Sequence, residues 1–133
     1  MPGPLSPGAC FQLSDASGQR SHFWIVITKP EGAEQNALCV NITDQSNCED
    51  AACVLFPGEH PAVTKKLAIY YQKAMILPLS ELDHLGISAT ARVLPEVSPE
   101  ILKRIQEGGL RSDFITPVHR DLIKREINRR QSE

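Results

Sequence analysis

Large aromatic side chains are scarce in this sequence, which has one Trp, two Tyr and four Phe. Aliphatic residues must therefore supply most of any core, and the 41% content of apolar residues is ordinary for a folded chain. At 133 residues the chain is long enough for one domain with an apolar core that needs no metal or disulfide for its stability.

The sequence also lacks a long apolar run and a strong net charge. No run of 18 apolar residues is present, so no membrane-spanning segment is predicted. The first eight residues, MPGPLSPG, have neither the basic nor the apolar region of a signal peptide. We therefore expect a cytoplasmic location, where cysteines remain free thiols. The net charge of −2 argues neither for nor against a nucleic-acid partner.

Two strong strands are predicted in the first half of the chain. His22–Thr28 is rich in β-branched and aromatic residues and ends before Lys29-Pro30. Its nearly continuous apolar run predicts burial on both faces, as in a central strand. Ala37–Thr43 is the second, and its spacing favours an antiparallel pair. Shorter strands are expected over Gly8–Leu13 and Ala52–Leu55.

The segment after Phe56-Pro57-Gly58 allows two interpretations. Lys66–Tyr71 and Ala74–Leu77 suit two strands, whereas their Ala, Lys, Gln and Met residues also suit one helix spanning both. We favour the strands. Pro78–Leu82 then resembles a short helical turn.

Two helices are predicted towards the C-terminal end. Ser98-Pro99-Glu100 is a strong helix start, with Ser as the N-cap and Pro at the first helical position, and Gly108-Gly109 is predicted to end this helix. Thr116-Pro117 opens a second helix in the same way. From Arg120 to Arg130 the chain carries five basic residues against two acids, which could contact nucleic acid or an acidic partner, although most such faces are merely solvated.

The predicted fold class is therefore mainly β with C-terminal α. Residues 1–9 form a flexible lead-in, residues 10–110 a β-domain with its closing helix, and residues 111–133 a basic C-terminal helix.

The order of elements from Phe23 to Leu110 resembles the MazF/PemK family of toxin–antitoxin modules, which are small SH3-like barrels. Ser21–Thr28 occupies the place of that family's first strand, and Val40–Asp44 resembles the apolar-Thr-Ser end of its next strand. Lys65–Leu77 and Ser98–Gly108 are similar to a later strand and the closing helix. The resemblance covers about two-thirds of the chain and lies in order and spacing.

This resemblance implies an SH3-like barrel followed by two helices, acting as a metal-independent endoribonuclease on single-stranded RNA. It implies no cofactor, an antitoxin protein as partner, and a homodimer. The chemistry needs a group to activate the ribose 2′-OH, a cation for the pentacovalent phosphate and an acid for the leaving oxygen. The catalytic candidates are Arg20, His22, Thr43 and His60, and the substrate-binding candidates are Asp44, Lys65 and Lys66.

Each of these candidate residues is proposed for a different reason. His22 stands where the family has Arg, and Arg20 two residues earlier could supply the cation. Thr43 matches the family's Thr and could hydrogen-bond a phosphate oxygen, whereas Asp44 replaces Ser and brings a negative charge. His60 could act as an acid or base if the barrel folds it towards His22 and Thr43. At each position a structural role is the commoner outcome.

Two other functions stay open, a non-catalytic SH3-like binding module for nucleic acid or protein, and a phage or mobile-element accessory protein. No metal site is predicted. Cys48, Cys53, Cys39 and His60 could supply four zinc ligands on paper, but Cys39 and Cys53 lie in apolar strands, where a buried thiol is the commoner outcome.

Overall fold

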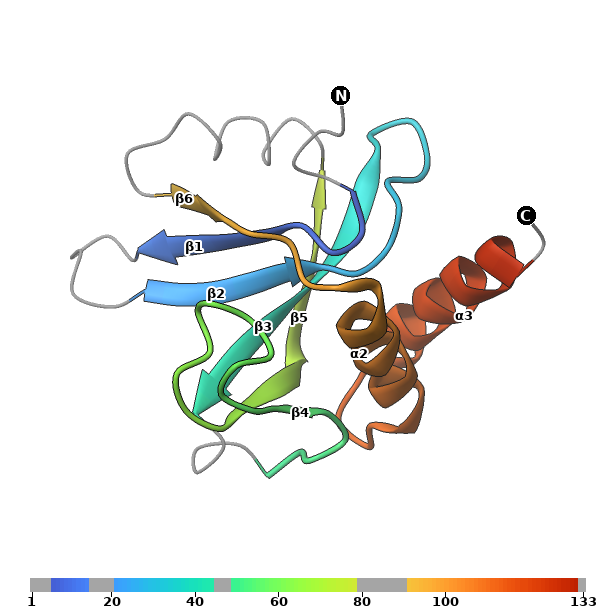
Figure 1. The fold of residues 1–133 in the computed structure, drawn as a ribbon. Coiled ribbons are helices and arrows are strands. Elements are labelled where there is room, and N and C mark those ends of the chain that lie inside the picture. The colour runs from blue at the N-terminus through green and yellow to red at the C-terminus, as the bar shows by residue number, and fades with distance from the viewer. Residues whose placement is uncertain (1–5, 15–20, 45–48, 79–90, 132–133) are drawn as a thin grey trace.

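The computed structural model describes residues 6–14, 21–44, 49–78 and 91–131, with the backbone alone at 13–14, 21–22 and 91–93. Over these ranges one antiparallel sheet has the strand order β4-β5-β3-β2-β1-β6. The sheet is curled into a half-barrel, and two helices follow it on one side (Figure 1). The predicted fold class, a small mainly β domain followed by two helices, is confirmed.

The elements have these bounds in chain order: β1 Cys10–Ser14, β2 Ser21–Val26, β3 Asn36–Asp44, β4 Val54–Leu55, β5 Leu67–Pro78, β6 Ala91–Leu94, α2 Pro99–Arg111 and α3 Pro117–Gln131. Neither described helix is long and apolar enough to cross a membrane.

Strands β2 and β3 pair antiparallel at the centre of the sheet, with Phe23 opposite Ile42. Residues 24–28 and 37–42 are buried without interruption. The predicted pairing and the predicted burial on both faces are thus confirmed. Burial on both faces explains why these segments read as continuous apolar runs rather than as alternating ones.

The sheet buries apolar side chains in two separate clusters. The main core lies between the sheet and the helices, and its members include Ile25, Leu38, Val40, Ile69, Tyr71, Ile105 and Ile123. The second cluster draws on the other side chains of the same strands and consists of Ala9, Phe11, Trp24, Val26, Ala37, Cys39 and Leu77.

Strand β5 confirms the strand interpretation of this segment, but as one irregular strand rather than two. Met75 lies opposite Cys39 and Tyr70 lies opposite Asn41, so residues 71–74 face Val40 alone. Within this bulge Tyr71 and Ala74 turn into the main core, whereas residues 72 and 73 are exposed. The bulge therefore supplies the buried tyrosine on which α2 packs.

Helix α2 begins as predicted, because the Ser98 hydroxyl accepts a hydrogen bond from the Ile101 N–H at 3.2 Å. The prediction that Gly108-Gly109 ends it is wrong. The helix continues to Arg111, and the N–H of Ser112 donates to the Gly108 carbonyl at 2.9 Å.

The two glycines are in the helix interior because α2 approaches its neighbours too closely for a side chain. A Cβ on Gly108 would lie 2.5 Å from the Tyr71 hydroxyl and 2.8 Å from the Cβ of Cys53. A Cβ on Gly109 would lie 2.5 Å from the Cδ1 of Ile123 in α3. The Tyr71 hydroxyl donates to the Ile105 carbonyl at 2.5 Å, which fixes α2 on β5.

Two buried polar side chains join the helices to the end of β2. Gln106 of α2 donates from Nε2 to the Ile27 carbonyl at 2.8 Å. Glu126 of α3 accepts from the Lys29 N–H at 2.7 Å and pairs with Arg129. Both side chains are almost fully buried, so the loss of either partner would leave a polar group unpaired in the core.

We predict that Gly108→Ala destabilises the fold, although Ala is the better helix former by about 1 kcal/mol. The added methyl group would overlap Tyr71 and Cys53, and overpacking of this kind costs about 1–3 kcal/mol. Guanidinium denaturation measures the free energy of unfolding.

Glu107→Ala, at the exposed position next to it, is the control and should change the free energy of unfolding by less than about 0.5 kcal/mol. A Gly108→Ala protein as stable as the wild type would contradict the close approach of α2 to β5.

Candidate functional site

His60 lies in a compact loop between β4 and β5 that is made of two consecutive turns. The Glu59 N–H donates to the Phe56 carbonyl at 3.1 Å, with Pro57 and Gly58 between them and a φ of 93° at Gly58. Pro followed by Gly at positive φ is typical of a type II turn. The second turn closes from the Val63 N–H to the His60 carbonyl at 2.9 Å.

Both ring nitrogens of His60 are bonded to the backbone. Nδ1 accepts from the Ala62 N–H at 3.0 Å, so Nε2 carries the proton and donates to the Pro95 carbonyl at 2.5 Å. The ring also stands edge-on to Phe23, with centroids 5.2 Å apart. His60 is only 3% exposed, so its ring fastens the loop to the segment before α2.

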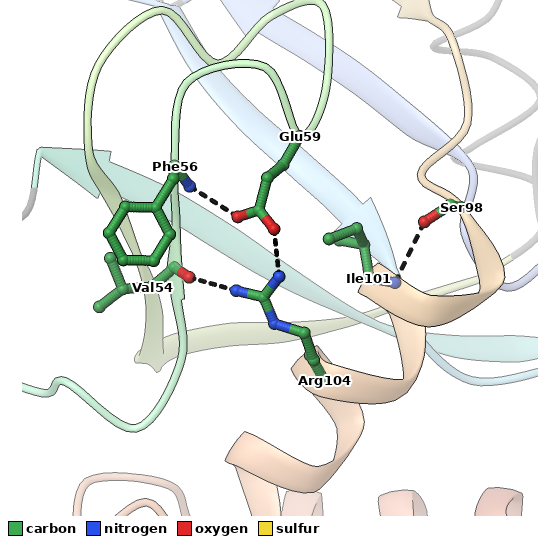
Figure 2. A network of polar contacts seen from close by, with 6 residues as sticks. All are labelled: Val54, Phe56, Glu59, Ser98, Ile101 and Arg104. Atoms are coloured by element: carbon green, nitrogen blue, oxygen red, sulfur yellow. Dashed lines mark hydrogen bonds and ion pairs between the residues drawn. The ribbon is translucent and has the colours of Figure 1, made fainter.

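Arg104 of α2 fastens the same loop from a second side (Figure 2). Its guanidinium donates to the Val54 carbonyl at 2.7 Å and forms an ion pair with Glu59. The other Glu59 oxygen accepts from the Phe56 N–H at 2.8 Å. The hydrogen bond that Arg104 donates to Glu59 lowers the pKa of Glu59 and raises the pKa of Arg104. The loop is therefore held by α2 rather than presented freely.

Thr43 and Asp44 lie half-buried at the end of β3, where β5 begins. Asp44 pairs with Lys65 at 2.7 Å between Oδ2 and Nζ, with side-chain exposures of 35% and 64%. Lys66 is also exposed, and its Nζ lies 5.7 Å from the centroid of the Phe56 ring. An ion pair this exposed contributes about 0–1 kcal/mol and exchanges readily with other charges.

Thr43 and His60 lie on opposite faces of the sheet. Side chains alternate along a strand, and residues 38, 40 and 42 join the main core, whereas Ala37 and Cys39 join the second cluster. Thr43 therefore faces the side of the second cluster. His60 contacts Phe23, which packs against the main core. The structure does not bring these two candidates together on one face.

His22 and Thr43 do fall at the same end of neighbouring strands. Phe23 of β2 pairs with Ile42 of β3. His22 directly precedes Phe23, and Thr43 directly follows Ile42, so both candidates lie at this end of the sheet. Arg20 lies outside the described residues, and so does the side chain of His22.

Three residues that the sequence analysis did not single out share the face of Thr43. Asn41 is opposite both Trp24 in β2 and Tyr70 in β5, so the three side chains form a row across the sheet next to Thr43. Trp24 and Asn41 are buried, and Tyr70 is half-buried. Because side chains alternate along a strand, the sequence could have placed Asn41 on the same face as Thr43. Its cross-strand partners, Trp24 and Tyr70, could be identified only from the register of the sheet.

The cysteines considered above as possible zinc ligands lie apart in the structure. Cys39 belongs to the second cluster and Cys53 to the main core, whereas Cys48 lies outside the described residues. Burial raises the pKa of Cys39 to about 12 and also raises that of Cys53. Within the described ranges, no group of three or more His, Cys, Asp and Glu side chains could hold a metal ion.

Comparisons with known proteins do not assign this chain to a family. No protein-family model matches it, and no curated protein matches it either.

We predict that His60→Phe lowers the free energy of unfolding. Phe keeps a ring against Phe23 but leaves the Ala62 N–H and the Pro95 carbonyl without their partner. A buried polar group left unpaired costs about 1–3 kcal/mol.

Urea denaturation measures this loss. Thr64→Ala, at an exposed position of the same loop, is the control and should have little effect. Unchanged stability of His60→Phe would contradict the fastening role of the ring.

Proposed function

We propose that this protein is a cytoplasmic, non-catalytic module that binds single-stranded RNA at the Thr43 end of its sheet. The observation that carries the proposal is the shared face of Tyr70 and Thr43. Lys65 and Lys66 are exposed at the same end of the sheet, but Asp44, which pairs with Lys65, and Phe56, which contacts Lys66, lie towards the opposite face, so a bound strand must pass around this end to meet all four residues. We call this set of four residues the Thr43 surface.

The Thr43 surface combines the groups that single-stranded RNA needs. Proteins bind such strands by pairing cations with phosphates and by stacking bases on aromatic rings. Tyr70 offers a half-buried ring, held in place by its strand. The hydroxyl of Thr43 can bond a phosphate oxygen or a ribose 2′-OH, and the two lysines supply charge.

The charges at this surface suit a displaceable ligand. Asp44 offsets one of the two lysines, but that ion pair is open to water, so a phosphate can replace the carboxylate. Lys66 rests over the exposed ring of Phe56, which leaves its charge uncompensated by that contact. Few phosphates are neutralised here, so binding should weaken with salt by a slope of about 0.7 per phosphate.

His60 is the reason for proposing binding without cleavage. Both of its ring nitrogens are bonded to backbone groups, and it lies across the sheet from Thr43. A general acid or base must reach the proton that it transfers. His60 therefore supports the fold of the loop rather than an RNA substrate.

We predict that purified protein binds a fluorescein-labelled single-stranded RNA of mixed sequence, measured by fluorescence anisotropy at low salt. Tyr70→Leu should weaken binding by about 1–3 kcal/mol, the contribution of one stacked base, whereas Tyr70→Phe should bind like the wild type. Replacing Lys65 and Lys66 together by Gln should weaken binding and lower its salt dependence.

Lys103→Gln, an exposed lysine of α2, is the control for the lysine pair. No binding at low salt would contradict the proposal. So would a loss with Lys103→Gln as large as with the lysine pair.

A second candidate is the MazF/PemK-like endoribonuclease that the resemblance implies, with an antitoxin partner and a homodimeric, cytoplasmic protein. One observation favours it, the position of His22 and Thr43 at the same end of neighbouring strands. In this candidate function Arg20 or His22 supplies the cation that stabilises the phosphate, and the Thr43 hydroxyl donates a hydrogen bond to one of the phosphate oxygens.

The same labelled RNA separates the two candidates. Under the binding proposal it stays intact after long incubation. Cleavage that Thr43→Val and Arg20→Ala abolish would instead support the endoribonuclease and overturn the non-catalytic assignment.

A further inference from the structure

Asn41 is a buried amide that finds no hydrogen-bond partner in the part of the chain that the structure describes. Its side chain, in β3, is 6% exposed. No hydrogen bond joins its amide group to another of the described residues. Buried polar side chains in folded proteins nearly always have a partner, so an unpaired one calls for an explanation. Water or a ligand must satisfy this amide.

The Asn41 amide lies in the row of side chains beside Thr43, between two aromatic residues. Trp24 is opposite it in β2, and Tyr70 is opposite it in β5. Opposite side chains of paired strands have their Cβ atoms about 4.5–5.5 Å apart, a spacing that a stacked nucleobase spans. A base that stacks on the half-buried ring of Tyr70 therefore has its edge within reach of the Asn41 amide.

The amide selects among bases through its neighbouring hydrogen-bond acceptor and donor. It forms two hydrogen bonds with a base edge that presents an N–H beside an acceptor. Adenine presents this pair at N6 and N7, whereas the same edge of guanine presents only the acceptors O6 and N7. Pyrimidines can also pair with an amide, but their single ring covers less of Tyr70. Adenine is therefore the base that Asn41 and Tyr70 together suit best.

We propose that Asn41 pairs with the base stacked on Tyr70 and gives the RNA-binding surface a preference for adenine. This inference rests on the proposed function, since it names the base that the same surface selects. Contacts of Thr43 and the lysines with phosphate and sugar accept any sequence, because those groups are the same in every nucleotide. Asn41 is thereby the residue that determines specificity.

Labelled oligouridylates that carry A, C, G or U at one central position test the proposal by fluorescence anisotropy. The strand with adenine should bind the wild type about tenfold more tightly than the all-uridine strand, which corresponds to about 1.4 kcal/mol. Asn41→Val should lose most of this preference, because Val has neither a donor nor an acceptor. Asn128→Ala, which removes an exposed amide on α3, is the control and should keep the preference.

Asn41→Val also tests whether the amide serves the fold. Val favours strands and removes a polar group from a buried position, so thermal melts should show no loss of stability. A markedly lower melting temperature would show that the fold uses the amide, and would overturn the inference.

The results also separate this inference from the proposed function. A wild type that binds all the strands equally, or that prefers another base, would overturn the adenine preference and leave RNA binding in place. So would an adenine preference that Asn41→Val retains. No binding of any strand would overturn the proposed function, and the inference with it.

Discussion

The close approach of α2 to the bulged part of β5 is the contact on which the rest of the fold depends. Tyr71 enters the core because the bulge turns it inward, and Gly108 lets the helix backbone reach its hydroxyl. The hydrogen bond from Tyr71 to the Ile105 carbonyl fixes the distance between α2 and β5. At the next position Gly109 accommodates Ile123, so α3 takes its place from the same pair of glycines.

With α2 in this position, the loop that carries His60 is fixed as well. Arg104 holds it through Glu59 and Val54, and His60 holds it through the Pro95 carbonyl at the approach to α2. The histidine that the sequence offers as an acid or base is thereby used for structure. Under the proposed function, a ligand binds on the opposite face, at Thr43 and Tyr70.

Much of the fold could be predicted from local patterns. Continuous apolar runs identified β2 and β3 and their burial, and Ser98-Pro99 identified the start of α2. Gly108 misled the prediction, because a glycine that ends a helix and one that permits close packing look alike until the neighbouring Tyr71 is known. The bulge in β5 was hidden for the same reason, since it depends on pairing with β3.

The candidate site could be predicted only in part. The position of His22 and Thr43 at the same end of the sheet could be predicted from two adjacent antiparallel strands, and the register agrees with it. The face of the sheet on which His60 lies could not be predicted from the sequence around it, because it depends on how the loop folds back over the sheet. Asn41 shares the Thr43 side by alternation along β3, whereas Tyr70 is placed there only by its cross-strand pairing with Asn41.

The central claim is that RNA binds at the Thr43 surface and that the His60 loop serves the fold. A ¹⁵N-edited NMR titration of the full chain with single-stranded RNA tests it most directly. The account predicts that amide shifts concentrate at Thr43, Lys65, Lys66 and Tyr70, with His60 and α2 unmoved. Shifts centred on His60 and Arg104, or no shifts at all, would contradict it.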